Sequence, residues 1–174
     1  MKVLIVSGSR GEWGYYTPII SQFKKFGVEY DILCTNMAPL RGFGGLVDQI
    51  ESSGENVKYK IYSAYQGDDH YSMAKGFASL SASVADIFAN THFDWVLLAG
   101  DRFEQFAVAS VCNLMYLPTA HIQAGELSGN VDGVTRHAIG KLVHLHFAAN
   151  MDAYKRLVSI GEEVERVVLS GAPQ

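Results

Sequence analysis

A mixture of carboxylate, amide, imidazole and guanidinium side chains occurs in the second half of the chain. Residues 121–126 read His-Ile-Gln-Ala-Gly-Glu, and they are followed by Asp132 and by the adjacent pair Arg136 and His137. If these side chains gather near the end of one strand, they can supply acid–base groups and anion contacts to a single ligand. A polar loop that is merely solvated is the competing interpretation.

A second candidate segment is residues 100–104, Gly-Asp-Arg-Phe-Glu. It places the Asp101 carboxylate and the Arg102 guanidinium at the start of a predicted helix. Aspartate is also a preferred helix N-cap residue, and acidic groups suit the positive end of a helix dipole. The segment is therefore compatible both with a ligand-binding role and with a capping role for Asp101.

A third candidate is the glycine-containing segment 7–14, Ser-Gly-Ser-Arg-Gly-Glu-Trp-Gly, which follows the first apolar run. Its glycines do not have the spacing of the dinucleotide-binding motif G-x-G-x-x-G. Arg10 could carry charge to a phosphate or a sugar. A plain strand-to-helix turn, in which glycine has a steric use, explains the segment equally well.

Histidines and aspartates elsewhere do not have the spacing of a metal site. His144 and His146 would project on one side of an extended strand, but no third ligand is spaced to join them. Asp68, Asp69 and His70 are expected to form an exposed approach to a helix. We therefore predict no bound metal and no cofactor.

Short runs rich in Val, Ile and Leu alternate with longer helical patterns, which predicts an α/β fold. The nearly continuous hydrophobicity of these runs is typical of strands that are buried on both faces of a parallel sheet. Repeated strand–helix–strand units then predict a doubly wound, Rossmann-like sheet. Predicted strands span residues 3–6, 30–34, 57–62, 95–98, 119–122, 146–149 and 167–169, and predicted helices span 16–26, 46–52, 72–90, 104–116, 133–145 and 152–160.

The predicted fold places the three candidate segments together. In an open parallel sheet, ligands bind at the carboxyl ends of the strands, where loops converge and helix N-termini present free N–H groups. Residues 7–14, 100–104 and 121–126 each follow a predicted strand. We expect all three segments to lie at one edge of the sheet.

Composition limits the classes of partner. Fourteen basic and eighteen acidic residues give a formal charge of −4, so the chain has no overall basic field for nucleic acid or an anionic membrane. No apolar stretch approaches the roughly 18 residues of a membrane span. Cys34 and Cys112 lack CxxC spacing, which predicts small core residues of a reduced, cytoplasmic protein.

Taken together, these segments resemble a known family. Residues 100–104, 121–126 and 132–144 look like the hydrolysing UDP-N-acetylglucosamine 2-epimerases of the sialic-acid pathway type, and residues 7–12 agree. Residues 166–173 resemble the point where that family crosses to its second domain. The resemblance spans the whole chain, but its specific motifs lie mainly between Gly100 and His146.

The resemblance implies that the chain is one half of a GT-B architecture, which has two Rossmann-like domains and an active site between them. Residues 1–170 would form the N-terminal domain and residues 171–174 the start of the interdomain linker. The second domain, which carries most of the UDP contacts in the family, would be missing. The resemblance therefore implies a UDP-sugar substrate, inactivity of the isolated domain, and a homo-oligomer for the full-length protein.

The resemblance also implies a reaction and site residues. Family members convert UDP-N-acetylglucosamine to N-acetylmannosamine and UDP, by eliminating UDP across C1–C2 to a glycal and then adding water. Asp101 and Asp132 match two acidic catalytic positions of the family. Contacts to the sugar or the phosphates are expected from Arg10, Arg102, Arg136 and His137.

Two departures from the family pattern affect these expectations. Gln123 stands where the family has a third catalytic glutamate, and Glu126 is the nearby residue that could compensate; both are included among the catalytic candidates. Residues 35–40 lack the usual glycine and histidine. Either the substrate is a related sugar nucleotide, such as a bacillosamine type, or activity is lost.

The resemblance leaves two competing functions open, because fold does not fix function. One is the acceptor-side domain of a GT-B glycosyltransferase, whose sheet would look alike. The second is a truncated, non-catalytic binding module. A glycosyltransferase would not specifically need Asp101 together with Asp132, Arg136 and His137, so mutation of these residues discriminates between the two. Loss of UDP release without loss of acceptor binding would favour the epimerase.

Overall fold

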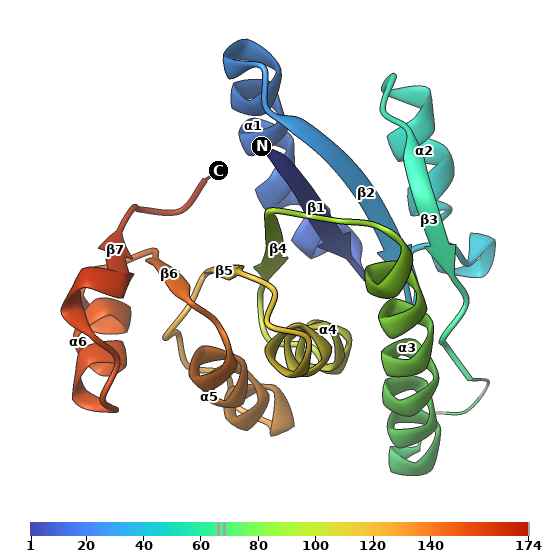
Figure 1. The fold of residues 1–174 in the computed structure, drawn as a ribbon. Coiled ribbons are helices and arrows are strands. Elements are labelled where there is room, and N and C mark those ends of the chain that lie inside the picture. The colour runs from blue at the N-terminus through green and yellow to red at the C-terminus, as the bar shows by residue number, and fades with distance from the viewer. Residues whose placement is uncertain (66, 68, 174) are drawn as a thin grey trace.

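The computed structural model describes residues 1–65, 67 and 69–173 as a single parallel sheet with helices on both faces (Figure 1). The strand order is β3-β2-β1-β4-β5-β6-β7, which confirms the predicted doubly wound α/β fold. Asp68 and Gln174, which the sequence assigns to an exposed loop and to a linker, lie outside the described residues. The strands are β1 (Lys2–Ser7), β2 (Glu29–Thr35), β3 (Val57–Ile61), β4 (Trp95–Ala99), β5 (Thr119–Ile122), β6 (Leu145–Ala148) and β7 (Val167–Leu169).

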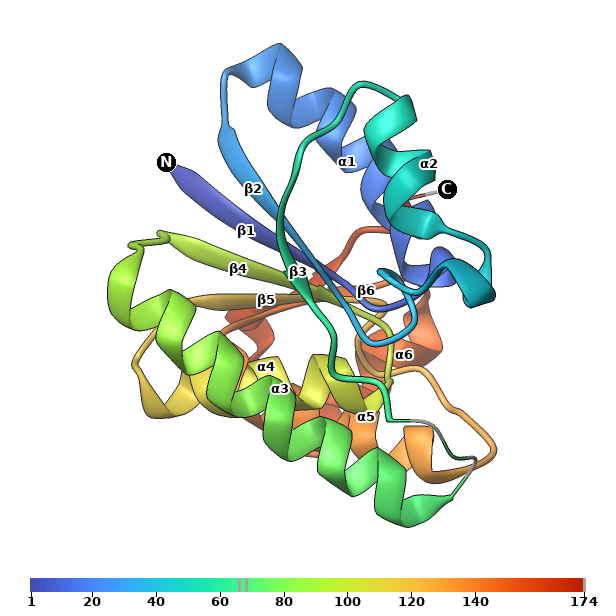
Figure 2. The same cartoon turned by 90° about the vertical axis from the view of Figure 1, so that its right-hand side faces the viewer.

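The helices form two layers around this sheet. Figure 2 shows α1 and α2 on one face and α3 to α6 on the opposite face. Their bounds, with those of two short 3₁₀ segments, are α1 (Arg10–Phe26), η1 (Arg41–Phe43), α2 (Leu46–Ser52), α3 (His70–Asn90), α4 (Phe103–Leu114), α5 (Val131–Leu142), α6 (Met151–Ser159) and η2 (Val164–Arg166).

The strand order reverses next to β1. This strand pairs with β2 on one side and with β4 on the other, both in parallel, so that Val3 lies between Tyr30 and Trp95. Successive crossovers run outward from β1 to β3 in one direction and from β4 to β7 in the other. At such a reversal, neighbouring loops separate at the carboxyl edge and leave a crevice where ligands bind.

Central strand β1 is buried on both faces, which explains its unbroken apolar sequence. Leu4 and Val6 belong to the core cluster formed with α3, α4 and α5. Val3 and Ile5 belong to the cluster on the α1 face, with Tyr16 as its largest fully buried member. The two free cysteines are buried as predicted, Cys112 in the first of these clusters and Cys34 in a third cluster that includes residues of α2.

Most predicted boundaries agree with the structure to within two residues, but one helix start and one helix end are wrong by more. Helix α1 begins at Arg10 rather than Tyr16, because the Ser9 hydroxyl caps it by accepting the Glu12 N–H at 3.4 Å. Leu145 lies in β6 rather than in the preceding helix. The helix ends at Leu142, because the next residue is extended and the His144 N–H then donates to Thr119 O at 3.0 Å.

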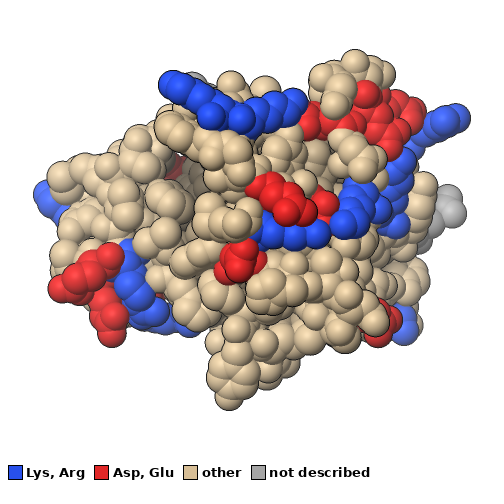
Figure 3. Space-filling view, turned by 45° about the horizontal axis from the view of Figure 1, so that its top comes forward, with Lys and Arg blue, Asp and Glu red and all other residues tan. Residues whose placement is uncertain are grey.

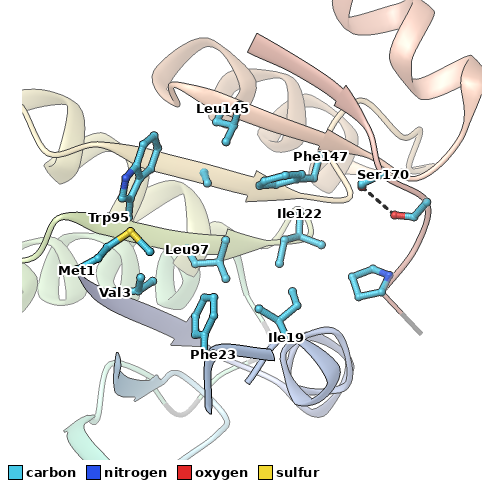
Figure 4. A pocket seen from close by; sticks show the side chains of 13 residues that line it. Met1, Val3, Ile19, Phe23, Trp95, Leu97, Ile122, Leu145, Phe147 and Ser170 are labelled. Atoms are coloured by element: carbon cyan, nitrogen blue, oxygen red, sulfur yellow. Dashed lines mark hydrogen bonds between the residues drawn. The ribbon is translucent and has the colours of Figure 1, made fainter. Parts of the chain in front are cut away.

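One face of the sheet is open above β4, β5 and β6. A groove of about 410 Å³ lies there, and Figure 4 shows its apolar lining. Trp95, Leu97, Ile122, Leu145 and Phe147 project into it from the strands. The predicted site residues lie away from this groove, at the carboxyl edge of the sheet.

Charge on the surface is mixed. Figure 3 shows acidic and basic side chains in small alternating groups, separated by uncharged surface, on the face that it displays. This agrees with a formal charge of only −4. Within the described residues, no helix is both long and apolar enough to span a membrane.

Replacement of Gly125 tests how helix α6 supports the turn after β5. Gly125 has φ +78°, and a Cβ there would lie 2.5 Å from Ala153 O. Gly125→Ala should therefore lower the free energy of unfolding by about 2–4 kcal/mol in urea denaturation. Gly129→Ala is the control, since its Cβ would enter open space. Equal stability of the two variants would contradict this packing.

Candidate active site

Polar segments that follow β4 and β5 meet at the carboxyl edge of the sheet. Asp101 lies in the turn between β4 and α4, and Glu126 lies between β5 and α5. Arg136 reaches both from the second turn of α5. The three side chains come from different elements, and Arg136 contacts both carboxylates directly.

Arg136 is the centre of this cluster. Its side chain is only 7% exposed and forms an ion pair with Asp101 through Nη2. Nη1 lies 3.4 Å from Oε2 of Glu126. The hydroxyl of Ser128 also donates to the same Asp101 oxygen. A buried guanidinium requires such partners, because an unpaired buried charge is strongly destabilising.

His121 fixes the turn that carries Asp101. Its side chain is fully buried, and Nε2 donates to Gly100 O at 2.6 Å. Burial is the main cause that lowers the pKa of His121 to about 4, and the Arg136 charge lowers it further. The imidazole is therefore neutral near pH 7, with its proton on Nε2. Among the described residues, Nδ1 has no hydrogen-bond partner.

Asp132 lies near enough to Arg102 at this edge for its charge to affect the Arg102 guanidinium. Asp132 lies in the first turn of α5, which Asn130 caps by accepting the Asp132 N–H at 2.9 Å. Burial lowers the pKa of the Arg102 guanidinium, but Glu104, Glu12 and Asp132 together raise it above its usual value. Within the described part of the chain, no side chain donates a hydrogen bond to the Asp132 carboxylate. That carboxylate is free to meet a ligand.

Arg10 lies apart from the Arg136 cluster. It is exposed at the start of α1, and Nη2 donates to Phe43 O at 3.3 Å. Together with Ser9, Met37 and Ala38, these two residues line a pocket of about 200 Å³. The structure thus places Arg10 against the segment after β2 rather than beside Asp101.

Gln123 and His137 complete the predicted set. Gln123 follows β5, is half-buried, and has φ +58°. His137 is half-buried next to Arg136 on α5, and its buried Nδ1 has no hydrogen-bond partner among the described residues. Within the same part of the chain, neither side chain has a contact that assigns it a chemical role.

A pocket of about 300 Å³ opens beside Arg102, between the ends of β2 and β3 and the starts of α3 and α4. Its lining is partly apolar and partly polar. The residues are Asn36, Met37, Phe43, Ser63, Ala64, Tyr65, Gly67, Asp69, His70, Ser72, Met73, Arg102 and Phe103. Arg102 thus borders a space that can hold part of a small ligand.

The sequence interpretation missed two buried carboxyl groups, Glu12 and Glu104. Each lies in the first turn of a helix, where an acidic residue normally complements the helix dipole at the surface. Here their exposed fractions are 4% and 0%. Their proximity arises because the first turns of α1 and α4 meet at the carboxyl edge of the sheet, which no local motif reveals.

In the part of the chain that the structure describes, His, Cys, Asp and Glu residues form no group of three or more that could hold a metal ion. His144 instead accepts the Thr119 N–H at Nδ1, at 3.2 Å. His146 is fully buried, with Nε2 3.3 Å from Glu162 Oε2. The two histidines therefore serve separate structural contacts.

Comparison with known proteins identifies similar chains. The family model described as UDP-N-acetylglucosamine 2-epimerase matches residues 22–174. A GDP/UDP-N,N'-diacetylbacillosamine 2-epimerase (hydrolyzing) from Campylobacter jejuni is 34% identical over 98% of this chain and 45% of its own length. A UDP-N-acetylglucosamine 2-epimerase from Neisseria meningitidis is 28% identical over 99% of this chain and 45% of its own length.

Solved structures agree with these sequence matches at the level of the fold. A UDP-GlcNAc 2-epimerase from Methanocaldococcus jannaschii, in complex with UDP-GlcNAc and UDP, superimposes with a TM-score of 0.87 at 21% identity. The match covers 99% of this chain and 47% of the other chain. The chain therefore spans about half the length of the relatives that it matches.

The low pKa of His121 predicts a pH dependence of stability. The unfolded histidine binds a proton as the pH falls below about 6.5, whereas the native one resists until about pH 4. The contribution of His121 to the free energy of unfolding is therefore fully present above pH 6.5, and it decreases as the pH falls from 6.5 to 4. When the pH is lowered from 7 to 4, the free energy of unfolding in urea should fall by about 2–3 kcal/mol more for the wild-type chain than for His121→Gln.

His92→Gln is the matched control, because the His92 side chain is 83% exposed. It should follow the wild-type pH dependence. If His121→Gln also follows it, His121 is not held neutral in the native state.

Proposed function

The chain belongs to the UDP-N-acetylglucosamine 2-epimerase family, and on this basis we propose that it is the N-terminal catalytic half of a hydrolysing UDP-sugar 2-epimerase. The sequence match covers nearly all of the chain, but only about half of each relative. The active site would be completed by a second domain, which also supplies most UDP contacts. The isolated chain would then bind its substrate weakly and lack turnover.

The observation that carries this proposal is the cluster of Asp101, Arg136 and Glu126 at the strand ends. Asp132 lies in the first turn of the helix that carries Arg136. The epimerisation requires proton transfer at C2 of the sugar and stabilisation of the departing nucleotide. Carboxylates can move the protons, and guanidinium groups can bind phosphate or sugar oxygens. The cluster contains both kinds of group at one edge of the sheet.

In the proposed reaction, a base removes the C2 proton while the C1–O bond to UDP breaks, which forms a glycal and releases UDP. Water then adds at C1, and a proton returns to C2 on the opposite face. The free sugar epimer is the second product. Two proton-transfer groups and at least one cation are therefore needed.

We assign the proton removal at C2 to Asp132. Asp101 already accepts from Arg136 and Ser128, so it is better suited to holding the guanidinium than to exchanging protons. Asp132 has no such donor among the described side chains. Arg102 and His137 would contact the substrate, and Arg10 would contact it only from the separate pocket beside Phe43.

The second proton-transfer group would be Glu126. Gln123 has an amide, which cannot exchange a proton near neutral pH. Glu126 keeps a carboxylate in the same cluster. It also accepts from Arg136 and from the Asn150 amide, but both contacts are long at 3.4 Å, so Glu126 is held more loosely than Asp101. Glu126 would perform the proton transfer that the resemblance assigns to the glutamate replaced here by Gln123.

The substrate would be a UDP-activated 2-acetamido sugar. The relatives at 34% and 31% identity are named for N,N'-diacetylbacillosamine, and one at 28% is named for N-acetylglucosamine. We therefore propose both UDP sugars as substrates to compare. A hydrolysing enzyme of this type would act in cytoplasmic biosynthesis of sialic-acid-like amino sugars.

Activity of the full-length protein encoded by this reading frame tests the proposal. UDP release and the sugar product should be followed by proton NMR with each of the two UDP sugars. Asp132→Asn should lower kcat by about 10²–10⁴-fold, the usual contribution of a general base. Asp101→Asn should lower kcat/KM strongly as well, since it leaves Arg136 without its main partner.

Asp152→Asn is the matched control, because Asp152 also lies in the first turn of a helix but is exposed. It should keep wild-type activity. Absence of UDP release from the intact two-domain protein, or full activity of both Asp101→Asn and Asp132→Asn, would contradict the proposed function.

A further inference from the structure

Two buried glutamates lie beneath the turn that follows β1. Glu12 comes from the first turn of α1 and Glu104 from the first turn of α4. The Gly8 N–H donates to Glu12 Oε2 at 2.5 Å. Glu104 packs against the other side of Gly8, where it occupies the space that a Cβ would need. Both carboxyl groups thus contact the same turn at the strand-order reversal.

The partners of Glu12 determine which of its oxygens can carry a proton. Gln105 Oε1 accepts the Ala99 N–H at 3.4 Å, so its amide nitrogen must point away from that strand. Gln105 Nε2 donates to Val6 O at 3.1 Å and to Glu12 Oε2 at 2.9 Å. Glu12 Oε2 therefore accepts from two N–H groups. A proton on Glu12 can reside only on Oε1.

Glu104 shows the same division between its two oxygens. Its Oε1 accepts from Arg102 Nε at 2.8 Å. Among the described residues, Oε2 of Glu104 and Oε1 of Glu12 have no hydrogen-bond donor. Buried oxygens without a donor are destabilising, and two adjacent buried carboxylates cannot both be ionised without large repulsion. One proton placed between these two oxygens removes both problems.

We propose that Glu12 and Glu104 share one proton between Glu12 Oε1 and Glu104 Oε2, and that the single negative charge, on Glu104, holds Arg102 at the ligand-binding edge. Glu104 is then a positioning residue that acts through Arg102. This second part rests on the proposed function, whereas the shared proton does not.

The electrostatic surroundings agree with this arrangement. Burial first, and then the Glu104 charge, raise the pKa of Glu12 well above its usual value. The other titratable groups that face Glu12 are Tyr16 on α1, Cys34 on β2 and Arg102 before α4. Burial raises the pKa of Tyr16 and raises that of Cys34 to about 12, so both are neutral. Arg102 is the facing cation, and it is already paired with Glu104.

Carboxyl ¹³C NMR on glutamate-labelled chain tests the shared proton without any activity measurement. One glutamate carboxyl signal should keep the chemical shift of a protonated acid at pH 7, and that signal should be missing in Glu12→Gln. Glu165→Gln, at an exposed position, should retain it. If every glutamate signal in the wild-type chain reaches the carboxylate position by pH 6, the proposal is wrong.

Thermal unfolding tests the shared proton independently, because the proposal fixes how the Tm difference between Glu12→Gln and the wild type changes with pH. The native acid keeps a proton that the unfolded chain releases above its usual pKa near 4.5. Wild-type stability from this group is therefore lost as the pH rises from 4.5 toward the raised native pKa. Glu12→Gln carries a permanent donor, so its Tm should exceed that of the wild type by about 3 °C or more at pH 8 and by less at pH 5. A Tm difference that stays constant with pH would overturn the shared proton.

Kinetics of the full-length protein test the positioning of Arg102. Glu104→Gln should raise KM by about tenfold and change kcat little, since Arg102 loses one charge-assisted contact. Glu12→Gln should leave KM unchanged at pH 7, because it mimics the protonated acid. An unchanged KM for Glu104→Gln, with the protonated signal still present in the wild type, would overturn only the positioning role. If the wild-type chain has no protonated glutamate signal, the shared proton is wrong, whatever the kinetics show.

Discussion

The requirement to neutralise a buried guanidinium organises the site edge of this domain. Arg136 is 7% exposed on α5, and its charge is met by Asp101 after β4 and by Glu126 after β5. Because an unpaired buried charge is strongly destabilising, these three segments must stay together for the domain to be stable. The same contacts that hold the fold therefore place carboxylates and a cation together at the carboxyl edge of the sheet.

The cost of an unpaired buried charge also applies where the strand order reverses. Glu12 and Glu104 are as deeply buried as the apolar core, yet among the described residues Arg102 is the cation that faces them both. A parallel sheet whose order reverses at β1 brings the first turns of α1 and α4 together at this point. Acidic residues that would be solvated at the start of an isolated helix are thus buried around the same glycine, Gly8. The Gly8 turn between them has no room for a side chain.

Much of the fold was predictable because its signals are local. Apolar runs indicated each of the seven strands found in the described part of the chain, and the order of strands and helices predicted the doubly wound sheet. The start of α1 was missed because Gly11 and Gly14 look like a loop, although the Ser9 cap decides the boundary. The polar segments were found, but the pairing of Asp101 with Arg136, and of Glu12 with Glu104, depends on contacts between distant elements. Arg10, grouped with the site from its sequence position, lies instead against Phe43.

The most direct measurement is a titration of ¹⁵N-labelled chain with UDP-N-acetylglucosamine and, in parallel, with UDP-N,N'-diacetylbacillosamine, followed through backbone amide shifts. If the strand-end cluster is half of a sugar-nucleotide site, shifts at millimolar ligand should concentrate at residues 100–102 and 125–137. The amides of Trp95 and Phe147, in the apolar groove, should stay in place. Shifts confined to that groove, or none with either ligand, would contradict the central claim.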